Sequence, residues 1–194
     1  PKIKGFLLFV EKKLLYYFTK NLKKKSNVIE IGCYHGKSTY FLCKGAQKNN
    51  SKVYSIDPFD RKYNGEKDFF KEIYKNKISK KEVHKTLTSY KLDNFELIEG
   101  LSEDISKGWN KQIDILFIDG NHSYEMVKQD YLGWSRFLKN GGRIIFHDSN
   151  KDNNIKNWEI GLEAPSKVVE EYLKAPKWSN ILKCGSIVSA IKLK

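Results

Sequence analysis

Residues 28–36 read VIEIGCYHG. An apolar run leads through Glu30 to Gly32 and Gly36, and KSTYFLCKGAQ at 37–47 can then form a helix. The order predicts a strand, a tight turn and a helix. Glycine in such a turn either adopts a positive φ angle in an ordinary connection or lets the backbone approach a ligand closely. The stretch itself leaves both interpretations open.

Composition predicts one ordinary globular domain with a sizeable core. The chain has 194 residues, of which 40% are hydrophobic, and its formal net charge is +13. A positive net charge favours acidic partners such as phosphates, nucleic acid, anionic sugars or an anionic membrane face. Lys greatly outnumbers Arg and no compact Arg cluster occurs. The sequence therefore permits nucleic-acid binding but does not favour it.

The three cysteines, Cys33, Cys43 and Cys184, have no CxxC spacing. An odd count without that spacing argues against a disulfide framework and against a zinc knuckle. Reduced thiols and a cytoplasmic location are therefore expected. No segment is long and apolar enough to predict a membrane span, and FLLFV at 6–10 is too short and too closely followed by charges to be a secretory signal.

Residues 1–25 are predicted to form an amphipathic basic helix. Apolar side chains recur at helical spacing, with lysines between them, at Ile3, Phe6, Leu7, Val10, Leu14, Phe18 and Leu22. Such a helix either packs on the domain or serves a membrane surface or a homodimer interface.

Residues 26–194 are predicted to form a single domain. Strand patterns at 27–32, 52–57, 95–100, 113–119 and 143–148 alternate with helical patterns at 37–48, 124–138 and 165–175. The fifth strand is expected to start after a turn at 140–142, and a hairpin is expected around Gly185. This alternation predicts a parallel α/β sheet with helices on both faces. The charged stretch 61–91 has little strand character and is predicted to be an insertion or lid.

Polar residues gather where the predicted strands end. In open parallel sheets, ligands bind beyond the carboxyl ends of the strands. The residues at these ends are Glu30, Gly32, Gly36, Asp57, Pro58, Phe59, Glu99, Ser102, Asp119, His122, His147, Asp148, Ser149 and Asn150. Asp57 stands close to the distance from the glycine turn that is expected of an acid binding ribose hydroxyls.

The turn has the pattern ExGxxxG instead of GxGxxG. A carboxylate at Glu30 would repel a pyrophosphate, which a dinucleotide site places at this turn. It would suit a cationic ligand that carries an amino group and a sulfonium, and S-adenosylmethionine is such a ligand.

A second, longer motif identifies a family resemblance. Residues 117–148 read FIDGNHSYEMVKQDYLGWSRFLKNGGRIIFHD. With the glycine turn, this resembles class I S-adenosylmethionine-dependent methyltransferases, and more narrowly a small-molecule O-methyltransferase-like group with the pattern IDGxHxY…GGxixxHD. The resemblance covers about residues 27–150 and, more weakly, the final hairpin.

The resemblance implies a Rossmann-like, doubly wound sheet of seven strands, mainly parallel with an antiparallel last strand. It implies that Gly32 and Gly36 let the loop approach the cofactor, that Glu30 holds its amino group and that Asp57 binds its ribose. Pro58 and Phe59 would line the adenine pocket, Ser102 would lie near the adenine, and Asp119 would lie near the methionine end and the substrate.

The expected activity is transfer of a methyl group to a hydroxyl of a sugar or another hydroxylated metabolite. An oxygen nucleophile must usually lose a proton, and His122 or His147 is the candidate general base. Alternatively a divalent cation lowers the pKa of the hydroxyl. The resemblance implies Mg²⁺ at Asp119, Asp148 and Ser149, although Ser149 departs from the acid or amide of the family.

The sequence also allows two other functions. The positive charge allows a nucleic-acid methyltransferase, and the fold alone allows a cofactor-binding subunit without catalysis. Trp158, in an Asn-rich stretch after the fifth strand, is a candidate for stacking on the substrate.

Overall fold

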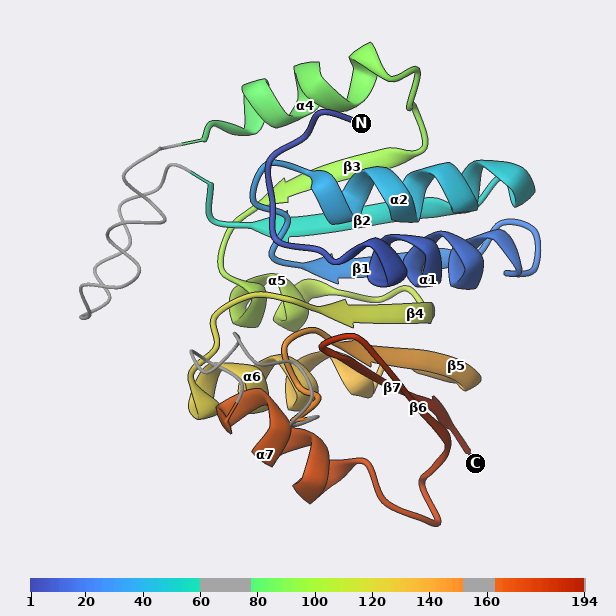
Figure 1. Cartoon of the computed structure of the whole chain (residues 1–194), viewed down its shortest axis with the longest axis vertical. Helices are drawn as coiled ribbons and strands as arrows, with labels where there is room; N and C mark the ends of the chain where they lie inside the picture. Colours follow the sequence, from blue (N-terminus) through green and yellow to red (C-terminus); the bar gives the residue numbers. More distant parts are fainter. Residues whose placement is uncertain (60–77, 152–162, 194) are drawn as a thin grey trace.

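The computed structural model describes residues 1–59, 78–151 and 163–193 of the chain (Figure 1). One seven-stranded sheet runs through the described part in the order β3-β2-β1-β4-β5-β7-β6. The strands are β1 Asn27–Ile31, β2 Lys52–Asp57, β3 Phe95–Glu99, β4 Ile113–Ile118, β5 Leu138–Phe146, β6 Trp178–Cys184 and β7 Ile187–Lys192. The helices are α1 Phe9–Lys20, α2 Lys37–Ala46, the 3-10 helix η1 Gln47–Asn49, α4 Lys80–Ser89, α5 Ser102–Gly108, α6 Tyr124–Ser135 and α7 Glu163–Tyr172.

The strand directions confirm the predicted fold class. Strands β1 to β5 pair in parallel, whereas β7 is antiparallel to both β5 and β6. The central strands are almost continuously apolar, and successive side chains point to opposite faces, so both faces of the sheet carry a core. One face packs on α1, α2 and α4, and the other packs on α6 and α7. In Figure 1, α1 and α2 lie side by side over β1 and β2.

The fifth strand begins earlier than predicted. β5 starts at Leu138, which pairs with Ile113, and the next paired residues are Arg143 and Ile115. Between these two paired positions β5 advances by five residues while β4 advances by two. The predicted turn is therefore a bulge inside the strand. Gly141, at φ +79°, lies in this bulge.

The N-terminal helix is shorter than predicted, and only part of the predicted apolar face packs on the domain. Ile3 and Leu7 are buried, but they precede α1, and Val10 is 46% exposed. The buried residues of α1 are Glu11, Leu15 and Thr19. Leu14, Phe18 and Leu22 of the predicted pattern are partly buried against the same core, whereas Glu11 and Thr19 are polar and therefore fall outside an apolar pattern.

Part of the predicted insertion is a regular crossover helix. Ser79 accepts a hydrogen bond from the backbone N–H of Glu82 and starts α4, which buries Val83 and Leu87 against the sheet. This helix connects β2 to β3, as a parallel sheet requires. Residues 60–77, on which the rest of the lid prediction falls, lie outside the described residues, as does Trp158.

The contact between α1 and α2 depends on Gly45. A Cβ atom on Gly45 would lie 2.0 Å from Thr19 Oγ1 and 2.4 Å from the carbonyl oxygen of Tyr16. The two helix backbones therefore approach each other at a position that no larger residue fills without movement.

We expect Gly45→Ala to lower the free energy of unfolding by about 1–3 kcal/mol, because the new methyl group forces α1 away from α2. Gly108→Ala, at the end of α5, is the matched control, since a Cβ there has no neighbour within 4 Å. Urea denaturation of both variants measures the difference. Equal stability of the two variants would contradict the proposed close contact.

Candidate functional site

The carboxyl ends of β1, β2, β4 and β5 lie at one edge of the sheet and bring most of the predicted site residues together. Gly32 takes φ +82°, and a Cβ there would lie 2.2 Å from the carbonyl oxygen of Asp119. Gly36 takes φ +83° at the start of α2, where a Cβ would lie 3.1 Å from Val83. Positive φ and close protein packing account for both glycines, and their approach to a cofactor stays a prediction.

Glu30 lies beneath this turn with no exposed surface. One carboxylate oxygen, Oε2, accepts hydrogen bonds from Thr39 Oγ1 at 2.6 Å and from Ser55 Oγ at 2.5 Å. The other, Oε1, has no hydrogen-bond partner among the described residues. Burial raises the pKa of Glu30 to about 7, although neighbouring hydroxyl groups lower it. A buried carboxylate oxygen without a partner is a site for a cationic donor.

Asp57 holds the glycine turn in place. Its Oδ2 accepts from the backbone N–H groups of Cys33 at 2.9 Å and Tyr34 at 3.0 Å, and its Oδ1 accepts from Phe59 N–H at 2.7 Å. A carboxylate offers about four lone-pair directions. The three observed bonds therefore leave room for a further donor on Asp57.

The residues predicted near the adenine have protein partners of their own. Phe59 is 4% exposed and belongs to the core on the α1, α2 and α4 face, while Pro58 is half-buried. Ser102 Oγ accepts from Trp134 Nε1 at 2.8 Å. It lies beside Asp130, whose pKa burial raises to about 7. The role of these residues toward an adenine ring stays a prediction.

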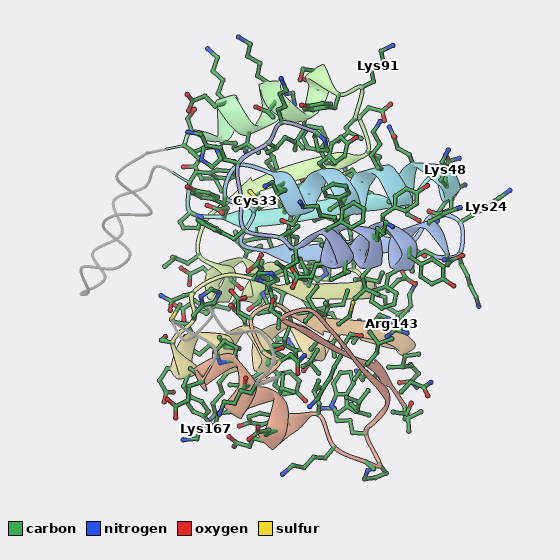
Figure 2. All side chains as sticks on the ribbon, viewed as in Figure 1. Lys24, Cys33, Lys48, Lys91, Arg143 and Lys167 are labelled. Carbon is green, nitrogen blue, oxygen red and sulfur yellow. The ribbon has the colours of Figure 1, made fainter. Side chains whose placement is uncertain are left out.

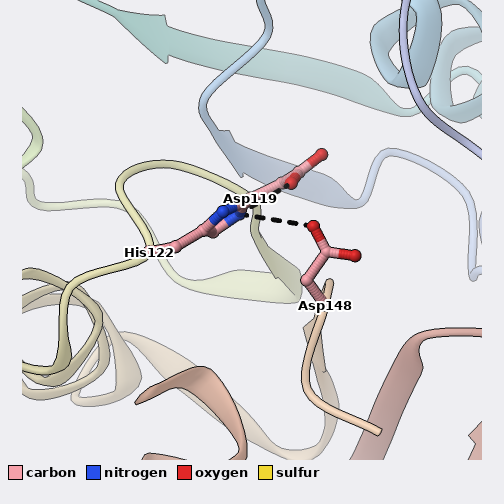
Figure 3. Close-up of side chains that lie close together, drawn as sticks. All are labelled: Asp119, His122 and Asp148. Carbon is pink, nitrogen blue, oxygen red and sulfur yellow. Dashed lines mark ion pairs between the residues drawn. The ribbon is translucent and has the colours of Figure 1, made fainter. Parts of the chain in front are cut away.

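Three residues from two loops form a compact cluster (Figure 3). His122 Nε2 lies 3.9 Å from Asp119 Oδ1 and 3.5 Å from Asp148 Oδ2. One ligand atom from each of these residues lies within 4.8 Å of the others, an arrangement that can hold a metal ion. Ser123, not His122, caps α6, because its hydroxyl accepts from Met126 N–H. His122 is therefore available for chemistry.

The charges of the cluster are coupled. Burial would raise the pKa of Asp119, but His147 and His122 outweigh it and hold that pKa below 3.8. Burial would lower the pKa of His122, but Asp119 and Asp148 raise it above 6.5. In such a pair, the carboxylate can position a substrate hydroxyl group, and the imidazole can receive its proton.

His147 lies behind the cluster, and both of its ring nitrogens face carboxylates. Nδ1 is 3.0 Å from Asp119 and 3.2 Å from Asp148, and Nε2 is 3.3 Å from Glu11. Burial alone would lower the pKa of His147, but these three acids raise it well above 6.5. As a cation, His147 carries a proton on each nitrogen and has no lone pair with which to accept another.

Glu11 reaches the site from α1, and sequence reasoning missed it. It has no exposed surface, and its Oε1 accepts from both the backbone N–H of Ser186 at 2.7 Å and the hydroxyl of Ser186 at 2.8 Å. Its Oε2 accepts from Leu8 N–H at 2.7 Å. Burial would raise the pKa of Glu11, but His147 and these backbone donors hold it below 4.5.

Ser149 does not join the cluster. Its hydroxyl donates to the carbonyl oxygen of Phe146 at 3.0 Å and accepts from Val188 N–H at 3.2 Å. The structure thus brings His122, which the sequence analysis assigned as a base, to the place where the family resemblance led us to expect Ser149.

Sequence reasoning also missed the hydroxyl groups around Glu30. Ser38 and Thr39 lie two and three residues after Gly36, and Ser55 is the one serine of the strand KVYSID. A polar residue at an inward strand position was a usable signal. Glu11 gave no such signal, because an acid among lysines on a helix is typical of a solvent-exposed face.

This strand order, with a buried acid beneath a glycine turn and polar strand ends at one edge, is the arrangement expected of a class I S-adenosylmethionine-dependent methyltransferase. A family model described as a methyltransferase domain matches residues 29–149, more than half of the chain. The chain therefore belongs to this methyltransferase domain family, and the resemblance identified from the sequence is confirmed.

Solved structures share the fold at low sequence identity. A putative caffeoyl-CoA O-methyltransferase from Staphylococcus aureus matches with a TM-score of 0.68 and 18% identity, over 98% of this chain and 86% of that one. A methyltransferase of Podospora anserina, solved with bound S-adenosylhomocysteine, matches at 0.65 and 19%, over 94% and 77%. An rRNA methylase from Streptococcus thermophilus matches at 0.62 and 15%, over 98% and 100%.

We expect Glu11→Ala to lower the free energy of unfolding by about 3–5 kcal/mol, because it leaves His147 buried without one of its carboxylate partners. Asp104→Ala is the control, since Asp104 forms an exposed ion pair with Lys107 whose loss should leave the stability almost unchanged. Glu11→Gln, which keeps the acceptor oxygen and loses the charge, should fall between them. Denaturant unfolding monitored by circular dichroism gives all three values, and a Glu11→Ala value equal to the control would refute the role of Glu11.

Proposed function

We propose that this methyltransferase transfers the methyl group of S-adenosylmethionine to a hydroxyl group of a small molecule, such as a sugar or another hydroxylated metabolite. The observation that carries the proposal is the cluster of Asp119, His122 and Asp148 at the sheet edge that also holds Glu30 and Asp57. Two carboxylates and an imidazole can bind and deprotonate a hydroxyl group. The fold shared with O-methyltransferases supports the same proposal.

The cofactor fits the residues of this edge. When bound, S-adenosylmethionine supplies a methyl group on a positively charged sulfur. Glu30 Oε1, buried and without a partner, would accept from the cofactor's amino group. Asp57 would use its remaining acceptor capacity for the ribose hydroxyls. Pro58, Phe59 and Ser102 are proposed to contact the adenine.

Proton removal is assigned to His122. The side chain of His147 is only 3% exposed and both of its ring nitrogens face carboxylates, so a substrate hydroxyl cannot reach it and we no longer propose it as the base. His122 is 26% exposed at its side chain and can meet a substrate. Asp119 and Asp148 would orient the imidazole and stabilise its charge once it has taken the proton.

A divalent cation is the alternative means of activating the hydroxyl. Two carboxylates and one imidazole form a donor set for such an ion, and Asp148 Oδ1 is buried without a hydrogen-bond partner among the described residues. Asp119, Asp148 and His122 would hold the ion, which would lower the pKa of the acceptor hydroxyl. His122 then would not act as the base, so the two arrangements exclude each other.

A nucleic-acid substrate is the second candidate, and the net charge of +13 favours it. Salt-dependent binding of RNA or DNA at low ionic strength would support it, and no binding under those conditions would remove it. A cofactor-binding subunit without catalysis remains a third function, which tight cofactor binding without turnover would favour.

We expect the protein to bind S-adenosylhomocysteine and Asp57→Ala to weaken that binding about 100-fold, since hydrogen bonds to a charged acceptor contribute about 1.5–3 kcal/mol. Calorimetric titration measures both affinities. Asp104→Ala is the control for removal of an acid, and thermal unfolding must show that Asp57→Ala is folded, because Asp57 also holds the glycine turn. Unchanged affinity in folded Asp57→Ala would remove Asp57 from the cofactor site.

If a cation binds, Mn²⁺ titrated into the protein should show one saturable site that Asp148→Asn weakens by at least about tenfold and His122→Ala weakens as well. Ser149→Ala should leave the Mn²⁺ affinity unchanged, because its hydroxyl bonds to Phe146 and Val188 instead. Electron paramagnetic resonance of free Mn²⁺ gives the affinities. Absence of saturable binding would remove the cation and leave His122 as the proposed base.

A further inference from the structure

The N-terminal segment has an outer surface of one charge sign. Residues 1–25 contain eight lysines and a single acid, Glu11. Because Glu11 is fully buried, no carboxylate side chain of this segment reaches solvent. The elements that pack on α1, which are α2, η1 and β6, contain no Asp or Glu. Figure 2 shows Lys24 and Lys48 pointing away from the protein at one end of this region.

Large apolar side chains lie among these lysines. Phe6 is 62% exposed, Phe9 67%, Val10 46% and Tyr17 62%. These four are among the nine exposed large hydrophobic residues of the described part of the chain, and they include the three most exposed, Phe9, Phe6 and Tyr17. Phe9, Lys13 and Tyr17 are spaced by four residues and so lie on one face of α1, and Lys13 Nζ lies 4.4 Å above the Phe9 ring. We call Phe6, Phe9, Val10, Lys13, Tyr17 and Lys20 the α1 outer face.

We propose that the α1 outer face docks on an anionic lipid bilayer. A helix that presents aromatic and aliphatic side chains between lysines lies in the plane of a membrane interface, where the rings enter the headgroup region and the ammonium groups contact lipid phosphates. The inference does not depend on the proposed methyl transfer, because it concerns a surface and not the site.

Two other occupants are less suited to this face. In a two-fold dimer, the same lysine-rich surface would meet itself, and no exposed acid of the α1 outer face is available to pair with it. Single-stranded nucleic acid is usually bound in a basic groove lined by several elements, whereas the α1 outer face is formed by one helix and the residues just before it, on the outside of the sheet (Figure 1). The aliphatic side chain of Val10 also offers nothing for a base to stack on.

The α1 outer face lies close to the candidate functional site. Phe6 stacks on Tyr34, with ring centroids 6.1 Å apart, and Tyr34 belongs to the glycine turn. Lys37 at the start of α2 donates to the carbonyl oxygen of Gly5 at 2.6 Å. One end of the α1 outer face therefore adjoins the glycine turn, which belongs to the edge of the sheet proposed to bind the cofactor. Docking would place that edge near the bilayer surface.

The test is sedimentation of the protein with phosphatidylcholine vesicles, with and without phosphatidylglycerol. We expect binding only to the anionic vesicles, weakened by added salt. Lys13→Gln combined with Lys20→Gln should weaken binding about 30-fold, since each lysine near such a surface contributes about a factor of five. Phe9→Ser combined with Tyr17→Ser should weaken it about tenfold or more.

Matched controls separate this face from charge and apolarity in general. Lys81→Gln with Lys85→Gln removes the same charge from the exposed side of α4, and Leu132→Ser with Ile181→Ser removes exposed apolar residues elsewhere. Both control pairs should bind anionic vesicles as the parent does, and circular dichroism should show all variants folded.

Three outcomes would overturn the proposal. The first is no binding to anionic vesicles, or a control pair that loses as much vesicle affinity as the α1 variants do. The second is displacement of vesicles by an RNA oligonucleotide that needs the same lysines, which would assign the face to nucleic acid. The third is a protein that does not bind vesicles but forms a dimer in analytical ultracentrifugation, where Phe9→Ser combined with Tyr17→Ser dissociates that dimer.

Discussion

The buried contact between Glu11 and His147 is the constraint on which the rest of the site depends. It fixes a positive charge beneath Asp119 and Asp148, two carboxylates that would otherwise repel each other at the end of the sheet. The same carboxylate of Glu11 holds Ser186 in the turn between β6 and β7. One side chain of α1 therefore joins the first helix, the fifth strand and the last hairpin, which are far apart in the sequence.

The fold could be predicted from the sequence because its signals are local and repeated. Short apolar strands alternate with helices, and this pattern alone specifies a parallel sheet covered on both faces. The errors occurred where a local rule was overridden. Leu138 begins a strand across two glycines because a bulge absorbs them, and Val10 lies outside because Glu11, an acid, takes the inward position. Neither result follows from periodicity.

The candidate site could be predicted only in part, for a related reason. Asp119, His122 and Asp148 each follow a strand, so the rule that ligands bind at carboxyl ends placed them at one edge. That rule gives the edge but not the direction of a side chain. The hydroxyl of Ser149 accepts from Val188 N–H in the final hairpin, and Asp57 turns toward the backbone of the glycine turn that follows β1. Such choices depend on hydrogen-bond partners from distant segments, which a single sequence does not reveal.

The two sides of α1 connect these observations. Its inner side places Glu11 against His147, and its outer side carries lysines and aromatic rings without an exposed acid. α1 packs closely on α2 at Gly45, and α2 begins just after Gly36, in the glycine turn of the candidate site. Burying the only acid of this segment serves both purposes: it neutralises His147 inside and leaves the outer surface uniformly positive.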